Sequence, residues 1–324
     1  MDDSWMKQDR PLIVVTNQAH PDALAVLARF ARIDANPAEA PWPRAELLRR
    51  TASADGLLAF MTDHVDAEFL AHCPDLRAIG CALKGADNFD LAACRARNVA
   101  VAVVEDLLTA PTAELALGLM IGLGRHIRAG DALVRGGGFA GWRPILFGAG
   151  LQGAVVGIIG MGAVGQGIAA RLAGFACRRI IHHDPAVEGS VGLTELLATA
   201  DWVVLAAPLN RGTLHMIDGP ALARLQPGAL LVNIARGSLV DEAAVAAALQ
   251  SGHLGGYAAD AFELEDWARA DRPSAIPAAL LAHPRSLFTP HLGSAVVEVR
   301  RQIAMQAATA LAEFFAGRPM PGRL

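Results

Sequence analysis

Arginine, carboxylate and histidine side chains of the kind that bind anions and move protons follow strand-like runs in the second half of the chain. Arg236 ends LLVNIAR, Glu265 comes shortly after GGYAAD, and His291 follows LFTP. An arginine offers a fixed fork of donors for an oxyanion, and a histidine oriented by a carboxylate is poised as a general base near neutral pH. Because ligands of open α/β sheets bind beyond the carboxyl ends of the strands, we predict that these three residues form a catalytic site. Taken singly, they could equally be a sheet-end salt bridge, a surface charge and a turn residue.

A glycine-rich turn, Gly160-Met-Gly162-Ala-Val-Gly165, lies between the apolar run AVVGIIG and a helix-like segment. In this context the glycines permit a tight turn, close approach of a pyrophosphate and close helix–strand packing, which is typical of a dinucleotide site. Asp184 ends the next strand-like run and is placed to accept hydrogen bonds from an adenosine ribose. The same carboxylate would repel a 2′-phosphate by about 4 kcal/mol at about 4 Å and an effective dielectric of about 20, so we predict NAD as the cofactor. A tight turn without a ligand is the structural alternative.

Lys84 is a lone cation in CALKGADNFD, directly after the strand-like run LRAIG. A solvated loop lysine is the simple interpretation. The functional interpretation is a second cation for a small anion, because one arginine leaves about one charge of a dianion uncompensated. A second cation across a cleft would contribute a few kcal/mol at an effective dielectric of about 20.

Two series of alternating strand-like and helix-like segments must position these residues. The alternation predicts an α/β fold with two doubly wound parallel-sheet domains, a flavodoxin-like substrate domain and a Rossmann NAD domain. We expect residues 1–108 and 295–324 to form the substrate-binding domain and residues 109–294 the NAD-binding domain. Residues 111–138 read as one long apolar helix ended by glycines, and residues 297–317 as a last helix.

Composition excludes several function classes. The 324 residues are 53% hydrophobic with a net charge of −4, and their cations are interspersed with acids, so neither nucleic acid nor an anionic membrane is an expected partner. Residues 144–170 lack charge, but their glycine density favours turns over a membrane span. The four cysteines show no C-x-x-C pair and the amino terminus shows no apolar signal region, so we expect a cytoplasmic protein. No spacing of His, Cys or carboxylates predicts a metal site.

The chain resembles the D-2-hydroxyacid dehydrogenase family through GMGAVG, NIARGSLVDE, the Asp260/Glu265 pair and TPHLGS, in the family's order and over nearly the whole chain. The resemblance implies that Arg236 binds the substrate anion, His291 handles the proton and Glu265 hydrogen-bonds the imidazole. It implies a homodimer, for which the apolar helix from Pro111 is a candidate interface. It also implies that the remaining cofactor contacts come from Ala163, Val164, Pro208, Thr112 and Asp260.

CALKGADNFD and YAADAFELEDWARADRP resemble one branch of this family, the phosphite (phosphonate) dehydrogenases. The segment EDWARADRP, residues 265–273, stands where most members continue directly to a Glu-Pro pair. The resemblance implies phosphite as the small-molecule substrate, oxidised to phosphate with water as the nucleophile. The implied substrate contacts are Lys84, Gly85, Met61, Trp142, Ser294 and Arg300, while Phe147 stands where this branch commonly has tyrosine.

Two other functions are also compatible with these residues. The same triad could reduce a small 2-keto acid to a D-2-hydroxy acid, with the substrate hydroxyl taking the place of water at His291. A non-catalytic NAD-sensing regulator could also retain the triad. Lys84 and residues 265–273 favour phosphite over the 2-keto acid, whereas a turnover assay is needed to separate an enzyme from the regulator.

Overall fold

The computed structural model describes residues 10–104 and 106–324, which fold into two compact units. Unit 1 comprises the residues up to Leu108 together with Trp267–Ala270 and Ala295–Leu324, and unit 2 comprises Thr109–Asp266 and Asp271–Ser294. The short segment Trp267–Ala270 therefore differs from the sequence-based division. These four residues show no helix or strand pattern, so the sequence does not indicate that they belong to unit 1.

Unit 1 is built on a five-stranded parallel sheet in the order β2-β1-β3-β4-β5. This is the flavodoxin-like order, in which the strand order reverses between β1 and β3. The strands are β1 Leu12–Val15, β2 Arg32–Ala35, β3 Gly56–Ala59, β4 Ala78–Cys81 and β5 Ala100–Ala102. The helices are α1 Pro21–Ala28, α2 Arg44–Thr51, α3 Ala67–His72, α4 Leu91–Ala96 and α12 Val297–Phe315.

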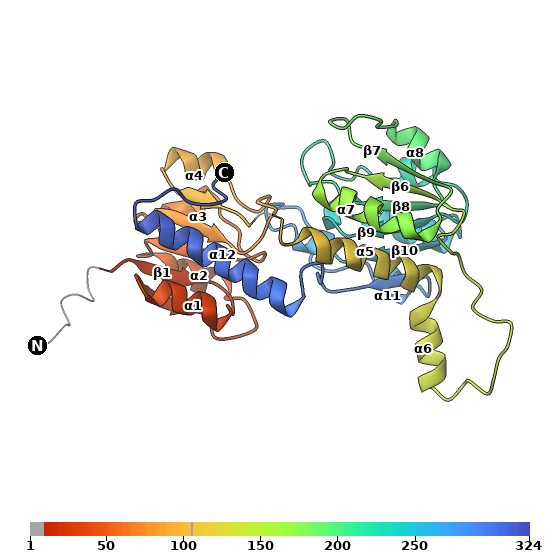
Figure 1. The fold of residues 1–324 in the computed structure, drawn as a ribbon, viewed down its shortest axis with the longest axis horizontal. Helices are drawn as coiled ribbons and strands as arrows, with labels where there is room; N and C mark the ends of the chain where they lie inside the picture. The colour runs from red at the N-terminus through yellow and green to blue at the C-terminus, as the bar shows by residue number, and fades with distance from the viewer. Residues whose placement is uncertain (1–9, 105) are drawn as a thin grey trace, which may run out of the picture. The chain divides into compact units, whose positions relative to one another are not determined.

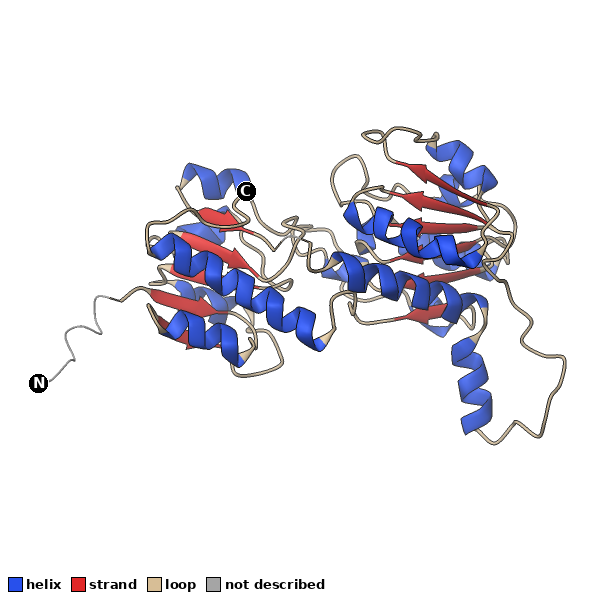
Figure 2. Ribbon diagram, in the orientation of Figure 1, coloured by secondary structure: helices blue, strands red, loops and turns tan. Residues whose placement is uncertain are grey.

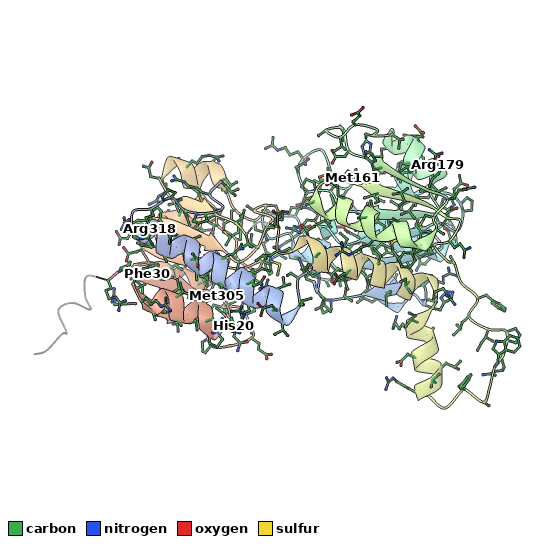
Figure 3. The ribbon with its side chains drawn as sticks, viewed as in Figure 1. His20, Phe30, Met161, Arg179, Met305 and Arg318 are labelled. Atoms are coloured by element: carbon green, nitrogen blue, oxygen red, sulfur yellow. The ribbon has the colours of Figure 1, made fainter. Side chains whose placement is uncertain are left out.

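The two faces of this sheet are covered by different helices because successive strand residues point to opposite sides. Ile13 and Val15 pack beneath α1 and α12, and Val14 packs beneath α2, α3 and α4. The helices α1 and α12 contact each other (Figures 1 and 3). The rings of Phe30 and Phe315 stack with centroids 5.9 Å apart where this pair ends. The last helix predicted from the sequence thus lies in unit 1.

Strand β2 has no counterpart among the predicted strands. It consists of RIDA, which contains two charged residues and lies at the edge of the sheet with none of its residues fully buried. A short half-exposed edge strand lacks the apolar run by which the other strands are recognised.

Unit 2 is built on a six-stranded parallel sheet in the order β11-β10-β9-β8-β6-β7. Figure 2 shows strands in red and helices in blue. The strand order reverses between β6 and β8, so the doubly wound fold predicted from the sequence is confirmed in both units. The strands are β6 Val155–Ile159, β7 Arg179–His183, β8 Trp202–Leu205, β9 Leu230–Asn233, β10 Gly256–Ala259 and β11 Ser286–Phe288. The helices are α5 Thr109–Gly124, α6 Ile127–Arg135, α7 Ala163–Leu172, α8 Leu193–Thr199, α9 Gly219–Leu222, α10 Glu242–Gln250 and α11 Ala278–Ala282. Three single 3₁₀ turns are η2 Ala173–Phe175, η3 Gly237–Leu239 and η4 Glu263–Glu265.

The prediction of one continuous helix over residues 111–138 is wrong. His126 has a φ of 53°, in the left-handed region, which ends α5 and lets α6 begin in a new direction. Helix α5 is largely buried against α7 and the sheet, whereas no residue of α6 is buried (Figure 1). The apolar character of this stretch therefore has two different causes, a core contact in α5 and an exposed surface in α6.

No helix in the described ranges is long and apolar enough to span a membrane. The uncharged stretch 144–170 instead contains a loop, the strand β6 and the first part of α7.

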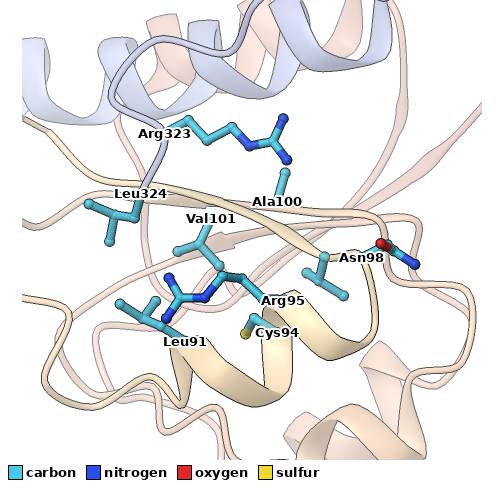
Figure 4. Close-up of a pocket in the computed structure, with 9 residues that line it drawn as sticks. Leu91, Cys94, Arg95, Asn98, Ala100, Val101, Arg323 and Leu324 are labelled. Atoms are coloured by element: carbon cyan, nitrogen blue, oxygen red, sulfur yellow. The ribbon is translucent and has the colours of Figure 1, made fainter.

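The carboxyl-terminal residues of the chain cover the exposed edge of β5. Ala102 forms an antiparallel bridge with Arg323, Val103 N–H donates to Gly322 O at 3.0 Å, and Leu324 N–H donates to Val101 O at 2.9 Å. A hollow of about 120 Å³ remains between this tail, β5 and α4 (Figure 4). The pairing satisfies backbone groups that an open edge would leave to other chains.

Asp63 ties together the ends of β1 and β3 at the point where the strand order reverses. Its buried carboxylate accepts hydrogen bonds from Phe60 N–H at 2.7 Å and from the Thr16 hydroxyl. Burial raises the pKa of Asp63 to about 6 in spite of these bonds. The carboxylate thus orders the turn from which Met61 projects, at an electrostatic cost that depends on pH.

We expect Asp63→Asn to remove part of the pH dependence of stability. The pKa is raised in the folded state, so the folded protein holds the proton more tightly and the free energy of unfolding falls as pH rises from about 4 to about 6. The fall amounts to about 3 kcal/mol for a shift of about two pKa units. Urea unfolding between pH 4 and 7 measures it. The exposed Asp75→Asn should keep the wild-type slope, and equal slopes in both variants would contradict the assignment.

Candidate active site

Arg236 lies at the carboxyl end of β9 on a turn fixed by Asn233. The buried Asn233 amide donates to Arg236 O at 2.8 Å and accepts from Ala235 N–H at 3.1 Å. A Cβ at Gly237 would lie 1.8 Å from the carbonyl carbon of Phe262, so only glycine lets η3 pack against the start of η4. The turn that presents the arginine is therefore held by its own strand and by the turn that follows β10.

Glu265 and His291 meet as the sequence predicts for a catalytic pair. His291 Nδ1 lies 2.6 Å from one carboxylate oxygen of Glu265, and the other oxygen accepts from Phe262 N–H at 2.8 Å. Because the carboxylate accepts at Nδ1, the ring nitrogen Nε2 remains for a reacting group. Both side chains are about one-quarter exposed, at 26% for His291 and 28% for Glu265, so the pair is reachable from solvent.

Asp260 organises the segment that presents His291. Its buried carboxylate accepts from the Thr289 hydroxyl at 2.6 Å, from Leu292 N–H at 2.7 Å and from Gly293 N–H at 2.8 Å. Its backbone carbonyl accepts from His291 N–H at 2.9 Å. These bonds hold His291 on both sides while its backbone adopts a left-handed φ of 56°. Burial, the largest influence, raises the pKa of Asp260 above its ordinary value.

The glycine-rich turn has the geometry of an anion cradle. Gly160 has a φ of 92° and ends β6, and Gly162 caps the amino end of α7, where Ala163 and Val164 form the first turn. A Cβ at Gly162 would meet no atom within 4 Å, so this helix end faces open space. Figure 3 labels Met161 within the turn. Backbone N–H groups and the helix dipole favour a phosphate at such a position.

Asp184 is brought next to this cradle from the end of β7. Its carboxylate accepts from Met161 N–H at 2.9 Å and from Ala186 N–H at 3.1 Å, and these two bonds lower the pKa of Asp184. Pro208 follows β8, the strand next to β6, and lies at the same edge of the sheet. The open helix end, the ionised carboxylate and the neighbouring strand end fit a dinucleotide whose pyrophosphate lies on α7 and whose ribose lies against Asp184.

Two further predicted residues of unit 2 lie beside the His291 segment. Thr112, in the first turn of α5, donates from its hydroxyl to Gly293 O at 3.3 Å, and Ser294 is buried at the end of the same segment. Trp142 is placed elsewhere. It lies on the loop that leads into the amino end of β6 and its side chain is 84% exposed, as is Phe147 at 78%. Within one chain, therefore, Trp142 is not brought together with Arg236 and His291.

The predicted residues of unit 1 lie on neighbouring strand ends and on α12. Met61 follows β3, and Lys84 with Gly85 follows the adjacent strand β4. Lys84 is 39% exposed, and its Nζ lies 3.9 Å from a carboxylate oxygen of Asp106. Arg300 lies in the first turn of α12, where burial lowers its pKa.

Several supporting residues of the site are not predicted from the sequence. They are Asn233, Thr289 and the buried pair Ser238–Asp266, in which Ser238 N–H donates to the carboxylate at 2.8 Å. Their signal is a polar residue at a strand end, which is too common to be specific. Among the described residues, no group of three or more His, Cys, Asp or Glu could hold a metal ion.

Comparison with known proteins agrees with this arrangement. The model of the family described as D-isomer specific 2-hydroxyacid dehydrogenase, NAD binding domain, matches residues 117–293. The chain is 32% identical to the glyoxylate reductase of Thermococcus litoralis over 326 aligned residues, which cover 96% of each protein. A solved structure from Thermus thermophilus superposes with a TM-score of 0.86 and 33% identity, over 97% of this chain and 99% of that one. The NADPH-dependent glyoxylate/hydroxypyruvate reductase of Sinorhizobium meliloti, solved with NADP and malonate, has a TM-score of 0.82 and 25% identity, over 98% and 97% of the two chains.

We expect Asp184→Asn to weaken discrimination against a 2′-phosphate. Asparagine keeps an acceptor for Met161 N–H but removes the negative charge. The ratio of the Kd for NADPH to that for NADH should fall at least about tenfold, which corresponds to about 1.4 kcal/mol of relieved repulsion. Fluorescence titration with both nucleotides measures the ratio. The exposed Glu188→Gln removes one charge from the same loop and should leave the ratio unchanged, whereas an unchanged ratio in Asp184→Asn would place the ribose elsewhere.

Proposed function

The chain belongs to the D-isomer-specific 2-hydroxyacid dehydrogenase family and is an NAD-dependent dehydrogenase, and from this premise we propose that it oxidises phosphite to phosphate. The observation that supports this substrate is Lys84, a cation at the carboxyl end of β4 in addition to the arginine of unit 2. Phosphite is largely a dianion at neutral pH, whereas a 2-keto acid has a single carboxylate. A second cation suits the first substrate better than the second.

Lys84 keeps most of its charge available for a ligand. Its neighbour Asp106 lies at 3.9 Å and is 86% exposed. An exposed ion pair at this distance contributes about 0–1 kcal/mol, so it competes weakly with a bound anion.

The segment that distinguishes the phosphite branch is bonded to the Lys84 loop within unit 1. Ala268 N–H donates to the Asn88 side-chain oxygen at 3.3 Å, and the Asn88 amide donates to Met61 O at 3.2 Å. Residues Trp267–Ala270 thus brace the two loops that supply Met61 and Lys84. This contact supports the proposal because it links the segment Trp267–Ala270 to the loop that carries Lys84.

The proposed chemistry follows from the residues of unit 2. Arg236 binds the phosphite oxygens, and His291 Nε2 accepts a proton from water while Glu265 holds the Nδ1 proton. The water oxygen forms the new P–O bond as the P–H bond breaks, and the proton passes to His291. When bound, NAD supplies the acceptor for the departing hydride.

Reduction of a small 2-keto acid is the second candidate, and the names of the relatives favour it. The relative from Thermococcus litoralis is a glyoxylate reductase, as is one from Pyrococcus furiosus at 32% identity over 96% of this chain. In this reaction Arg236 binds the carboxylate and His291 donates its proton to the carbonyl oxygen, while bound NADH would supply the hydride for the carbonyl carbon. Lys84 has no assigned role in that reaction.

Substrate turnover and Lys84→Met together decide between the candidates. We expect NADH to form with NAD and phosphite but not with D-lactate or D-glycerate. Lys84→Met should lower kcat/KM for phosphite about 100-fold, since it removes a few kcal/mol of charge compensation, with little change in the Kd for NADH. Arg95→Met, an exposed cation on α4, is the control and should behave as wild type. Turnover only with hydroxy acids, or with glyoxylate and NADH, would establish the second candidate, and silence on all of them would favour an NAD-sensing regulator.

We further propose that the protein is a homodimer and that α6 with the loop after it forms the interface. This part of unit 2 exposes Ile127, Val134, Phe139, Trp142 and Phe147, each by more than half of its surface. Large apolar side chains gathered on one projecting element are typical of an association surface. The sequence predicts an interface on one continuous helix from Pro111. Because α5 is buried in its own unit, we assign the proposed interface to α6 instead.

Light scattering tests this assembly. We expect a mass twice that of the 33.9 kDa chain. Trp142→Ser combined with Phe147→Ser should shift the mass towards the monomer, because it removes the most exposed apolar area. The exposed Leu281→Ser on α11 is the control. A wild-type protein that is monomeric at micromolar concentration would contradict the proposal.

A further inference from the structure

Behind the Glu265–His291 pair lies a group of buried acidic side chains that the proposed chemistry does not use. Glu242 at the start of α10 is 1% exposed, and Glu263 and Asp266 on either side of Glu265 are 6% and 3% exposed. Acidic residues are almost never fully buried unless they are paired. Their arrangement therefore calls for a reason.

Glu242 and Glu263 bind each other's backbone. Glu242 N–H donates to Glu263 Oε1 at 3.1 Å, and Glu263 N–H donates to Glu242 Oε1 at 2.9 Å. The second oxygen of Glu263 lies 2.9 Å from His215 Nε2, and His215 N–H in turn donates to Ser238 O at 2.7 Å. One side chain, Glu263, thus joins the start of α10, the segment after β8 and the 3₁₀ turn η4.

The protonation state of Glu242 at this junction changes near neutral pH. Burial first, and then the charges of Glu263, Asp266 and Glu265, raise the pKa of Glu242 to about 7. The second oxygen of Glu242 is buried with no hydrogen-bond partner, which favours a proton on this side chain. The other polar and charged groups at the junction are the His215 imidazole, the buried Tyr257 of β10 and Arg272, which donates to Leu264 O at 3.0 Å.

We propose that Glu263 is a positioning residue that orients η4 so that Glu265 meets His291. A 3₁₀ turn of three residues cannot orient itself, and Glu265 otherwise bonds only to the start of the same turn, at Phe262 N–H. The bonds of Glu263 attach this turn to α10 and to His215, in addition to the bond that Arg272 donates to Leu264 O. The Arg236 turn has further attachments of its own, to Asn233 and to the Asp266 carboxylate through Ser238, so loss of Glu263 should disturb the proton-handling pair more than the anion-binding residue.

Kinetics and proton NMR of four variants test this role, and the inference rests on the proposed function only for its kinetic part. Glu263→Ala removes both bonds of the side chain and leaves only the bond from its backbone N–H to Glu242 Oε1, whereas Glu263→Gln keeps an acceptor for Glu242 N–H. Asp241→Asn is the matched control, because it removes the charge next to Glu242 yet preserves the cap of α10, where Asp241 accepts from Ala244 N–H at 3.0 Å. Glu265→Gln identifies the far-downfield imidazole proton of the short His291–Glu265 bond.

We expect Glu263→Ala to lower kcat about 100-fold, as a small misplacement of catalytic groups does, with KM and the Kd for NADH within about threefold of wild type. The downfield proton signal should disappear in Glu263→Ala and remain in Asp241→Asn. Glu263→Gln should restore both the signal and most of kcat. Should Glu263→Ala not fold, His215→Ala, which removes one attachment, takes its place with the same readouts and an expected loss of about tenfold in kcat.

Two results would overturn the inference. One is a Glu263→Ala protein that keeps kcat and the proton signal. The other is a parallel loss of kcat, NADH binding and thermal stability, which would make Glu263 a general structural residue. If the wild-type protein turns over neither phosphite nor a 2-keto acid, the proposed function fails, and the proton signal alone decides whether Glu263 orients the pair.

Discussion

Parallel pairing of β9, β10 and β11 is the constraint on which the candidate site depends. Ala259 pairs with Asn233 on one side and with Phe288 on the other, so the three strands end level with one another. Arg236, Glu265 and His291 follow these ends and reach one edge of the sheet although they are far apart in sequence. A register shift of one residue would turn Asn233 and Asp260 to the opposite faces and release both turns that they hold.

Much of this arrangement is predictable because it is local in sequence. Gly160, Arg236 and His291 each follow an apolar run directly, so the run predicts both the strand and the edge at which the residue lies. The break at His126 is not predictable in this way, because a left-handed residue leaves the apolar pattern on both sides intact. The place of Trp142 is not predictable for a different reason: family resemblance supplies a role, but the position of a long loop depends on packing that no local pattern encodes. Residues Trp267–Ala270 likewise join unit 1 through tertiary contacts alone.

The family match and the question of substrate concern different parts of the chain. The matched residues 117–293 lie almost wholly in unit 2, which contains the cofactor cradle and the proton-handling pair. Met61, Lys84 and Arg300 lie in unit 1, outside that range. Membership of the family therefore accounts for the chemistry that all members share. In our proposal, the choice of anion depends on side chains outside the matched range, which relatives at about one-third identity need not share.

Helix α12 packs on the face of the unit 1 sheet that includes Ile13 and Val15. This helix follows all the strands of both units in the sequence. On the ribosome, the strands of unit 1 and α1 emerge first, yet the part of this apolar face that α12 covers stays exposed until residues 297–315 are made. Most of unit 2 is complete before that moment and can fold as the chain lengthens. Unit 1 thus completes its core after unit 2, and we expect the nascent chain to be most prone to aggregation before α12 is made.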